Sequence, residues 1–272
     1  MKKFIVVTVL TFALVFSAAM IASAAPTVSG EVNFGKNFET NSSIGYGKIN
    51  ADANITDNIS AHVGFEADGI LDSVTTDEAW FKMNGDMGTL QVGKFAYNQK
   101  SGIDILDPAI ADMEYALTAS YSVKVADGLT VNAAAANDDN VANPGLVYAV
   151  GVAYANDMFG GDVNYFKPVV GNDNSAIGAN AWYKLGDFKL FGNYEKNDTI
   201  DATDSVVGAS YDSAKMPLYG RVEYNLEAND ADNSNPYGVR VGYKVNNNMK
   251  VEYQTKQNST ADDQYLKAIV TF

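Results

Sequence analysis

The chain has 272 residues, and its 33 acidic side chains outnumber its 19 basic ones, which gives a net charge of −14. This balance excludes a nucleic-acid-binding protein, because no basic patch is available to neutralise phosphates. A single histidine and the absence of cysteine leave few nucleophile–base pairs. No phosphate-binding loop or zinc-ligand spacing occurs in the sequence. We therefore predict that the protein is not an enzyme and uses no cofactor or metal.

The segment Met1–Ala24 is predicted to be a secretory signal peptide. Lys2 and Lys3 supply the charged start, an apolar run follows, and Ala22-Ser23-Ala24 is a small-x-small cleavage site. An uncleaved anchor is the alternative, since the apolar run is about long enough to span a bilayer, but the cleavage site favours removal. Residues 25–272 would then form one domain with a net charge of −16, because the loss of Lys2 and Lys3 removes two positive charges from −14.

From Thr27 to the end of the chain, hydrophobic residues alternate with polar ones. Ile59, Ala61 and Val63, for example, alternate with His62 and Gly64. This period predicts β-strands with one apolar and one polar face. Sixteen such segments occur, near residues 27–36, 44–55, 59–69, 75–84, 88–95, 115–125, 129–137, 146–155, 161–167, 175–184, 187–195, 203–212, 216–227, 236–246, 249–257 and 264–272.

The connections between these segments alternate in length. Tight Gly/Asn/Asp turns such as Ala126-Asp127-Gly128 and Leu185-Gly186 suit hairpins, whereas connections such as Asn137–Gly145 and Ala228–Asn235 are longer and acidic. Short turns at one end and long loops at the other are typical of an outer-membrane barrel. We predict an all-β, transmembrane antiparallel β-barrel with short periplasmic turns, long external loops and both termini at the short-turn end.

Tyrosines near the strand ends favour this barrel over a soluble β-sandwich, which is the alternative for alternating strands. Sixteen tyrosines would be unusual in a soluble core, because each buried hydroxyl needs a hydrogen-bond partner. Membrane barrels place such residues in interfacial girdles. The tyrosines assigned to the girdles are Tyr46, Tyr121, Tyr154, Tyr183, Tyr194, Tyr211, Tyr224 and Tyr253.

Strand parity assigns each charged side chain to one face of the wall. A lysine or arginine facing lipid would cost about 2–4 kcal/mol at the bilayer midplane, so the polar face is predicted to line a water-filled lumen. Lys94 has the lipid-facing parity of Leu90 and Val92, and is therefore predicted to lie at a rim or beyond a bulge. The predicted lumen charges are Lys48, Lys82, Lys124, Lys189, Arg221, Arg240, Lys244, Lys250, Lys256 and Lys267, with Glu31, Glu66, Asp68, Glu78, Glu223 and Glu252.

The longest connection, Ala96–Glu114, follows the fifth strand. Loops beyond about 12–15 residues are uncommon in compact domains and are usually functional or disordered. This one carries apolar residues such as Ile103 and Leu106 among several acids, so it can pack against a surface. We interpret it as a loop that folds into the lumen and narrows it. A surface excursion packed by its own side chains is the alternative.

The signal peptide, the strand count, the long loop after the fifth strand and the final segment QYLKAIVTF, ending in Phe272, resemble the general porins of the Gram-negative outer membrane. The segment Asp77–Phe95, with Gly93-Lys94 near its end, is similar to the hairpin of the fourth and fifth strands of that family. The chain is shorter than most sixteen-stranded members, so fourteen strands are the alternative count. Val270 stands where many members carry an aromatic or larger apolar residue.

The resemblance implies an infolded third loop whose acids face basic residues on the wall, a homotrimer, and a terminal aromatic read by the barrel-insertion machinery. The apolar face of the first four strands is the candidate trimer interface, because small residues populate it (Gly30, Ala51, Ala53, Ala61, Ala67, Ala79). The acids of the run Asp68–Asp77 are predicted to be solvated loop acids, and a calcium site is the alternative.

These patterns predict an outer-membrane porin that passes ions and small hydrophilic solutes by diffusion, with a weak preference for cations. A non-conducting structural or adhesive barrel is the competing class. The cation preference follows from the net charge and the acidic loops. The predicted constriction consists of the loop residues Asp104, Asp107, Pro108, Asp112 and Glu114 facing Lys48, Lys82, Arg221 and Arg240, and Phe272 is the predicted assembly signal.

Overall fold

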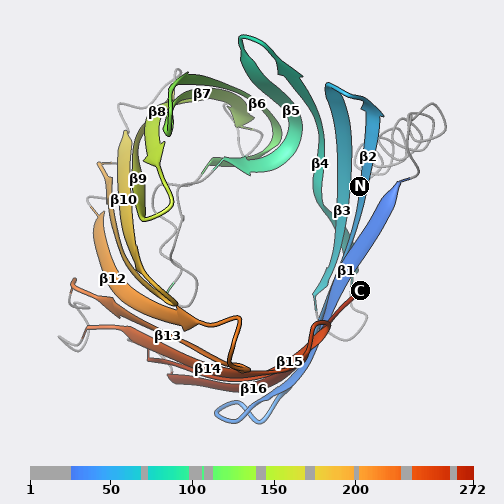
Figure 1. Cartoon of the computed structure of the whole chain (residues 1–272), viewed down its shortest axis with the longest axis vertical. Coiled ribbons are helices and arrows are strands. Elements are labelled where there is room, and N and C mark those ends of the chain that lie inside the picture. The colour runs from blue at the N-terminus through green and yellow to red at the C-terminus, as the bar shows by residue number, and fades with distance from the viewer. Residues whose placement is uncertain are drawn as a thin grey trace.

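The computed structural model describes residues 26–68, 73–97, 106, 113–138, 145–168, 175–198, 202–227, 235–257 and 262–272. They form a closed all-antiparallel barrel in which the last strand pairs with the first (Figure 1). The count of sixteen strands is confirmed, and the alternative of fourteen is wrong. The strands are β1 (Thr27–Asn37), β2 (Ser43–Thr56), β3 (Ile59–Asp68), β4 (Ser73–Gly85), β5 (Gly88–Tyr97), β6 (Met113–Ala126), β7 (Leu129–Asp138), β8 (Gly145–Ala155), β9 (Phe159–Pro168), β10 (Ala176–Leu185), β11 (Phe188–Asn197), β12 (Ala202–Asp212), β13 (Leu218–Asn225), β14 (Tyr237–Asn246), β15 (Met249–Gln257) and β16 (Asp262–Thr271).

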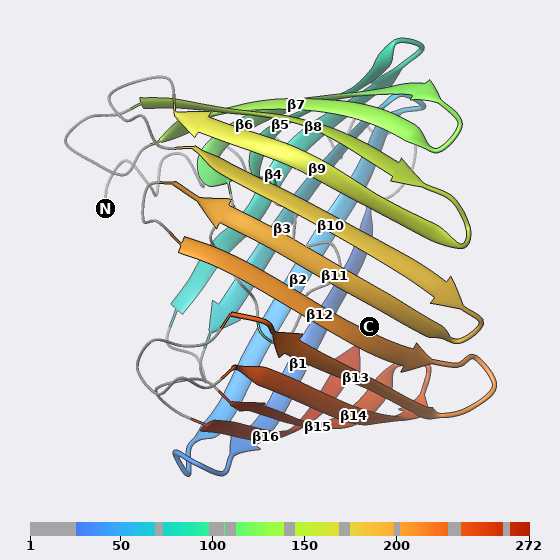
Figure 2. The same cartoon turned by 90° about the vertical axis from the view of Figure 1, so that its left-hand side faces the viewer.

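The tight hairpin connections gather at one end of the barrel (Figure 2). Gly128 and Gly186 supply the positive φ angles, 74° and 61°, that two of these turns need. β1 begins and β16 ends at this same end, because β1 and β16 pair antiparallel with Glu31 opposite Thr271. Both ends of the barrel domain therefore lie at the short-turn end, as predicted. The predicted signal peptide, Met1–Ala24, lies outside the described residues.

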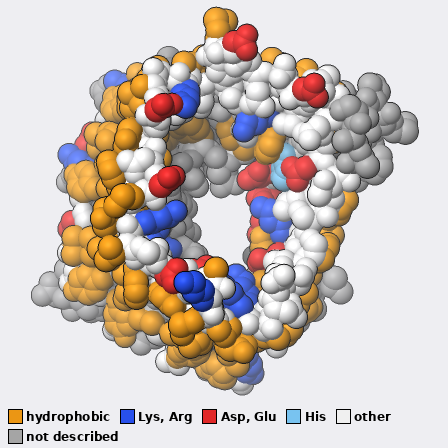
Figure 3. Space-filling model, in the orientation of Figure 1, with side chains coloured by type: hydrophobic (Ala, Val, Ile, Leu, Met, Phe, Trp, Pro, Cys, Tyr) orange, Lys and Arg blue, Asp and Glu red, His pale blue; other side chains and the backbone are white. Residues whose placement is uncertain are grey.

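The outward face of the barrel is apolar, as the alternation predicted (Figure 3). Large side chains such as Phe34, Ile49, Leu190 and Val241 are more than half exposed on it. A closed barrel can present such a face to hydrocarbon, because its ladders leave no strand edge unpaired. Within the described ranges, no helix is long and apolar enough to cross a membrane.

Most tyrosines assigned to the girdles lie on this outward face. Tyr211 packs its ring 4.9 Å from that of the exposed Phe188, whereas Tyr46 lies on the inner face, beside Lys48. The assignment of Tyr46 to a girdle is therefore wrong, because nearness to a strand end does not decide which face a side chain takes. The other exposed members are Tyr121, Tyr154, Tyr183, Tyr194, Tyr224 and Tyr253.

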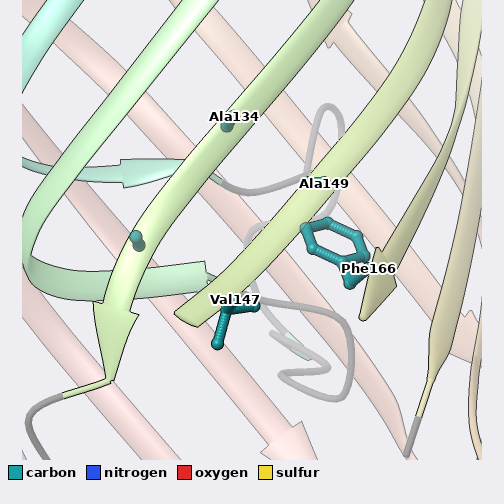
Figure 4. Packing of buried hydrophobic residues seen from close by; sticks show 5 residues of the cluster. Ala134, Val147, Ala149 and Phe166 are labelled. Atoms are coloured by element: carbon teal, nitrogen blue, oxygen red, sulfur yellow. The ribbon is translucent and has the colours of Figure 1, made fainter. Parts of the chain in front are cut away.

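The inner face is polar around much of the wall but not at β7, β8 and β9. There, next to the polar Asn164 of β9, a group of lumen-facing side chains is small or apolar and buried, and Figure 4 shows them on neighbouring strands. We call this set the apolar patch; it consists of Ala134, Ala136, Val147, Ala149 and Phe166. The prediction that the whole inner face is polar is thus wrong at these strands, because protein rather than water covers them.

The end of β5 turns into the barrel over the apolar patch (Figure 1). β4 and β5 pair only as far as Ala79 and Lys94. Gly93 makes the bend with a φ of 145°, and a Cβ there would lie 2.1 Å from the carbonyl oxygen of Ala79. Beyond it, Tyr97 packs edge-on to Phe166 with ring centroids 6.3 Å apart.

Lys94 lies where the ladder of β4 and β5 ends. The register between β5 and β6 shifts across Lys94, and its ammonium group donates a hydrogen bond to the carbonyl oxygen of Thr76. The prediction that Lys94 lies at a rim or beyond a bulge is therefore confirmed. Its charge does not face lipid in the middle of a regular strand.

Candidate pore and its charged walls

The barrel encloses an opening that charged side chains line (Figure 3). On the wall formed by β1 to β4, these side chains pair with each other. Lys48 forms an ion pair with Asp77. His62 lies between two carboxylates, with its Nδ1 2.8 Å from Asp52 Oδ1 and its Nε2 3.7 Å from Glu78 Oε2. Each of these five side chains therefore lies beside a partner with which it can form an ion pair or a hydrogen bond.

An aromatic contact fixes the imidazole of His62. The ring of Trp80 stacks on it with a centroid distance of 5.0 Å and an interplanar angle of 11°. The indole Nε1 of Trp80 donates a 3.0 Å hydrogen bond to Glu78 Oε2, so the same carboxylate faces both rings. His62 is buried at 9% exposure. The lumen parity predicted for His62 is confirmed.

Asp77 reaches the lumen because of a bulge in β4. The register of β3 and β4 shifts, since Gly64 pairs with Glu78 while the next residue, Phe65, pairs with Thr76. Simple alternation places Asp77 with Ala79 on the lipid side, so the sequence analysis did not include it. The sequence did contain a signal for this bulge. Asp77, like Lys94, is a charged residue at a lipid-facing position of a strand, which indicates an irregularity there.

On the neighbouring part of the wall, β13 to β16 carry a set of paired side chains that we call the charged arc, consisting of Arg221, Glu223, Arg240, Glu252, Gln254, Lys256 and Lys267. Arg221 Nε lies 2.5 Å from Glu223 Oε1, and its guanidinium carbon lies 4.2 Å from the ring centre of Phe191. Arg240 donates from Nε and Nη2 to Gln254 Oε1 at 3.0 and 2.7 Å. Such paired and stacked guanidinium groups keep their charge when partly buried.

Glu223 and Glu252 are almost completely buried and accept several donors. Glu252 Oε2 accepts the hydroxyl of Tyr219 at 2.8 Å, and its Oε1 lies 3.4 Å from Lys267 Nζ. Parity predicted both carboxylates to face the lumen, which is confirmed. Their role as acceptors inside the wall was missed, because a sequence does not show which charges share a partner.

Leu106 is the one described residue between Tyr97 and Met113. Its backbone N–H donates to Glu223 Oε2 at 2.8 Å, and its carbonyl accepts from Lys256 Nζ at 3.4 Å. Its side chain packs in a buried cluster with Phe191, Val206 and Trp182. Leu106, which lies between β5 and β6 in the sequence, is thus bound to β13 and β15, which lie about half the circumference away from those two strands.

A family model described as Gram-negative porin matches residues 8–264. The chain belongs to the Gram-negative porin family. Among solved structures, OmpF of Salmonella typhi, in complex with daunomycin, aligns to this porin with a TM-score of 0.67 at 16% identity, covering 91% of this chain and 97% of that one. A variant of the Rh. blastica porin aligns with a TM-score of 0.71 at 13% identity, covering 91% and 100%. No curated protein matches the chain.

Membership of this family gives the location and the type of the protein. It is a β-barrel channel of the outer membrane and not an enzyme. The solved structures, at their low identity, show that the fold is shared. Among the residues that the structure describes, no group of three or more histidine or acidic side chains is arranged to hold a metal ion.

The basic residues predicted to face the loop fall into separate places in this porin. Arg221 and Arg240 are direct cross-strand partners in the charged arc. Lys48 belongs to the wall formed by β1 to β4, where Asp77 pairs with it, and Lys82 on β4 lies near the short-turn end. A barrel distributes residues of equal parity around its circumference, and that these four residues face the loop acids stays a prediction.

Of the predicted constriction residues in the loop, Glu114 belongs to the described part of the chain. Asp104, Asp107, Pro108 and Asp112 lie outside the described residues. Glu114 belongs to β6 and pairs with Ala96 of β5, so the two strands extend further into the predicted loop than the alternation indicated.

The terminal Phe272 closes this porin's barrel. Its backbone exchanges two hydrogen bonds with Gly30, at 3.0 and 3.1 Å. A Cβ on Gly30 would lie 2.5 Å from the Phe272 ring, so the ring rests on the glycine. The small size of Gly30, predicted to serve a subunit interface, is thus accounted for by contact with the chain's own end.

Proposed function

We propose that this porin forms a water-filled channel for passive diffusion of ions and small hydrophilic solutes, narrowed by the segment between β5 and β6. The observation that carries the proposal is the binding of Leu106 to Glu223 and Lys256. Strands β5 and β6 lie about half the circumference away from β13 and β15 in the closed strand order. We infer that the connection between β5 and β6, which reaches Leu106, crosses the lumen.

The constriction would place acids opposite cations. Asp104 and Asp107 lie close to Leu106 in the sequence. Leu106 is hydrogen-bonded to Glu223 of the charged arc, and Glu223 forms an ion pair with Arg221. Charged rings of this kind set ion selectivity in pores. We expect a weak preference for cations, because the chain without its signal would carry a net charge of −16 and acid-rich external loops. Those acids would concentrate cations within a Debye length of about 8 Å at physiological salt.

Reversal potentials in a salt gradient test this proposal, measured on single channels in planar bilayers. The wild-type channel should favour cations, and the double substitution Asp104→Lys with Asp107→Lys should shift the preference toward anions and alter conductance. Unchanged selectivity and conductance would show that the segment does not line the pore. A wild-type preference for chloride would refute the sign, and folded protein that never conducts would favour the structural or adhesive barrel.

We also propose the assembly features that the family resemblance implies. These are cleavage after Ala24, a homotrimer packed through the outward face of β1 to β4, and recognition of Phe272 by the barrel-insertion machinery. The small outward residues Ala51, Ala67 and Ala79 support close approach of a second subunit there. A monomer on sizing in mild detergent would contradict the trimer.

A further inference from the structure

Two lysines face each other at the short-turn end of the lumen. Lys184 and Lys189 are direct cross-strand partners beside the turn that joins β10 to β11. Like charges placed directly opposite on neighbouring strands are destabilising. In the described parts of the chain, neither ammonium group has a carboxylate within ion-pair distance. Within the described ranges, the pair therefore has no neighbouring negative charge to balance it.

An aromatic ring holds both ammonium groups in place. Trp182 precedes Lys184 by two residues and therefore lies on the same face of β10. The Nζ atoms of Lys184 and Lys189 lie 5.4 and 5.3 Å from its ring centre, within the range of cation–π attraction. The ring rests on Gly160, where a Cβ would come within 2.8 Å of it. The two charges are thus gathered over one planar, supported surface.

A second lysine pair provides an internal contrast. Lys244 and Lys250 are also cross-strand partners, and both lie 5.9 Å from the ring centre of Tyr219. In that pair, however, Lys244 forms an ion pair with Asp212 and the Tyr219 hydroxyl is bonded to Glu252. Among the residues that the structure describes, no carboxylate supplies the same negative charge to Lys184 and Lys189.

The surroundings of the first pair add to its positive character. Lys189 is followed across the sheet by Ser210 and then by Arg221 in a continuous register row. Phe191, the cross-strand partner of Trp182, extends the aromatic surface beneath Arg221. Cations and rings therefore occur together, which is the chemistry that recognises an anion with a planar apolar body.

We propose that Lys184, Lys189 and Trp182 form a binding site for aromatic carboxylates at the short-turn mouth of the channel. The carboxylate would lie between the two ammonium groups, and the aromatic ring against the indole. The site rests on the proposed water-filled lumen, which gives such solutes access to it. It would retain planar organic anions on a wall of a channel whose overall charge favours cations.

The two tryptophans of the chain allow a direct binding assay. The substitution Trp80→Phe leaves Trp182 as the only indole, so its fluorescence reports on the proposed site. Para-nitrobenzoate, a quencher with the proposed chemistry, should quench the folded barrel in detergent along a saturable curve. Para-nitrobenzamide has the same ring without the charge and should give only linear, collisional quenching. Equal curves for the two compounds, or no saturation with the carboxylate, would overturn the proposal.

Matched charge removals locate the binding. In the Trp80→Phe background, Lys184→Gln with Lys189→Gln should weaken saturable binding about tenfold or more, the scale of one lost charge-assisted hydrogen bond. Lys244→Gln with Lys250→Gln removes the same charge and should leave binding within about twofold. Equal loss in both variants would overturn the site in favour of a general lumen potential. Conduction without saturable quenching refutes the site alone, whereas saturable quenching without conduction refutes the channel alone.

Discussion

Two parts of the lumen wall hold the chain that leaves β5, and they do so by different chemistry. The apolar patch receives Tyr97, the last residue of β5, through packing against Phe166. The charged arc receives Leu106 through hydrogen bonds to Glu223 and Lys256. The first contact excludes water from small aliphatic groups. The second satisfies the N–H and carbonyl groups of Leu106 with polar side chains, of which Glu223 is fully buried.

The difference shows that the polarity of a lumen wall depends on what covers each part of it. Buried charges are tolerated only when they are paired and hydrogen-bonded, and Glu223 has both Arg221 and the Leu106 N–H. The apolar patch offers no such donors or acceptors, so it suits an aromatic side chain instead. One anchor should therefore respond to loss of volume and the other to loss of charge.

The largest effect is expected from Phe166→Ala, which breaks the apolar anchor. The side chain is buried at 5% exposure, and truncating a buried phenylalanine costs about 3–5 kcal/mol of unfolding free energy. Urea unfolding of the barrel folded into vesicles measures the loss. The matched control is Phe188→Ala, because the side chain of Phe188 faces outward and contacts no segment in the lumen. Equal losses at the two positions would show that the patch has no special role.

A smaller effect is expected from Glu223→Gln, which breaks the charged anchor. The carboxylate accepts donors from Arg221 and Leu106, and hydrogen bonds to charged groups are worth about 1.5–3 kcal/mol. The control is Asp77→Asn on the wall formed by β1 to β4, where the partly exposed pair with Lys48 should contribute about 1 kcal/mol or less. Unfolding free energies rank the two variants, and an Asp77→Asn loss as large as that of Glu223→Gln would contradict the account.

The smallest effect is expected from Tyr97→Phe, which separates packing from hydrogen bonding in the apolar anchor. The hydroxyl of Tyr97 donates to Asn164 Oδ1 over a long 3.4 Å. Its loss should cost about 0.5–1 kcal/mol in unfolding free energy and leave conductance unchanged, because the ring stays on Phe166. A loss approaching that of Phe166→Ala would mean that the hydrogen bond, rather than the packing, holds β5.

Sequence alternation was sufficient to predict the strands, the tight turns and the lipid-facing side, because each depends on residues that are neighbours in the chain. It failed where a single residue alters the register. The bulge at Asp77 turns a lipid-parity charge into the lumen, since a shift of one residue exchanges the two faces of a strand.

Other features depend on contacts between distant segments. The apolar patch is explained only by the return of Tyr97, and Gly30 only by the ring of Phe272. Neither contact leaves a periodic signal in the sequence. For the same reason, parity predicted that Glu223 faces the lumen but not that it binds the backbone of Leu106.

The central claim is that the segment between β5 and β6 lines a conducting pore, and cysteine modification tests it most directly. The chain has no cysteine, so a single introduced thiol reacts without background. We expect a trimethylammonium-ethyl methanethiosulfonate to reduce the single-channel conductance of Asp107→Cys, next to the wall-bound Leu106. It should leave unchanged that of Asp127→Cys, whose native side chain is fully exposed in a short turn. Equal responses of the two variants, or an Asp107→Cys channel that reacts without any change in conductance, would contradict the claim.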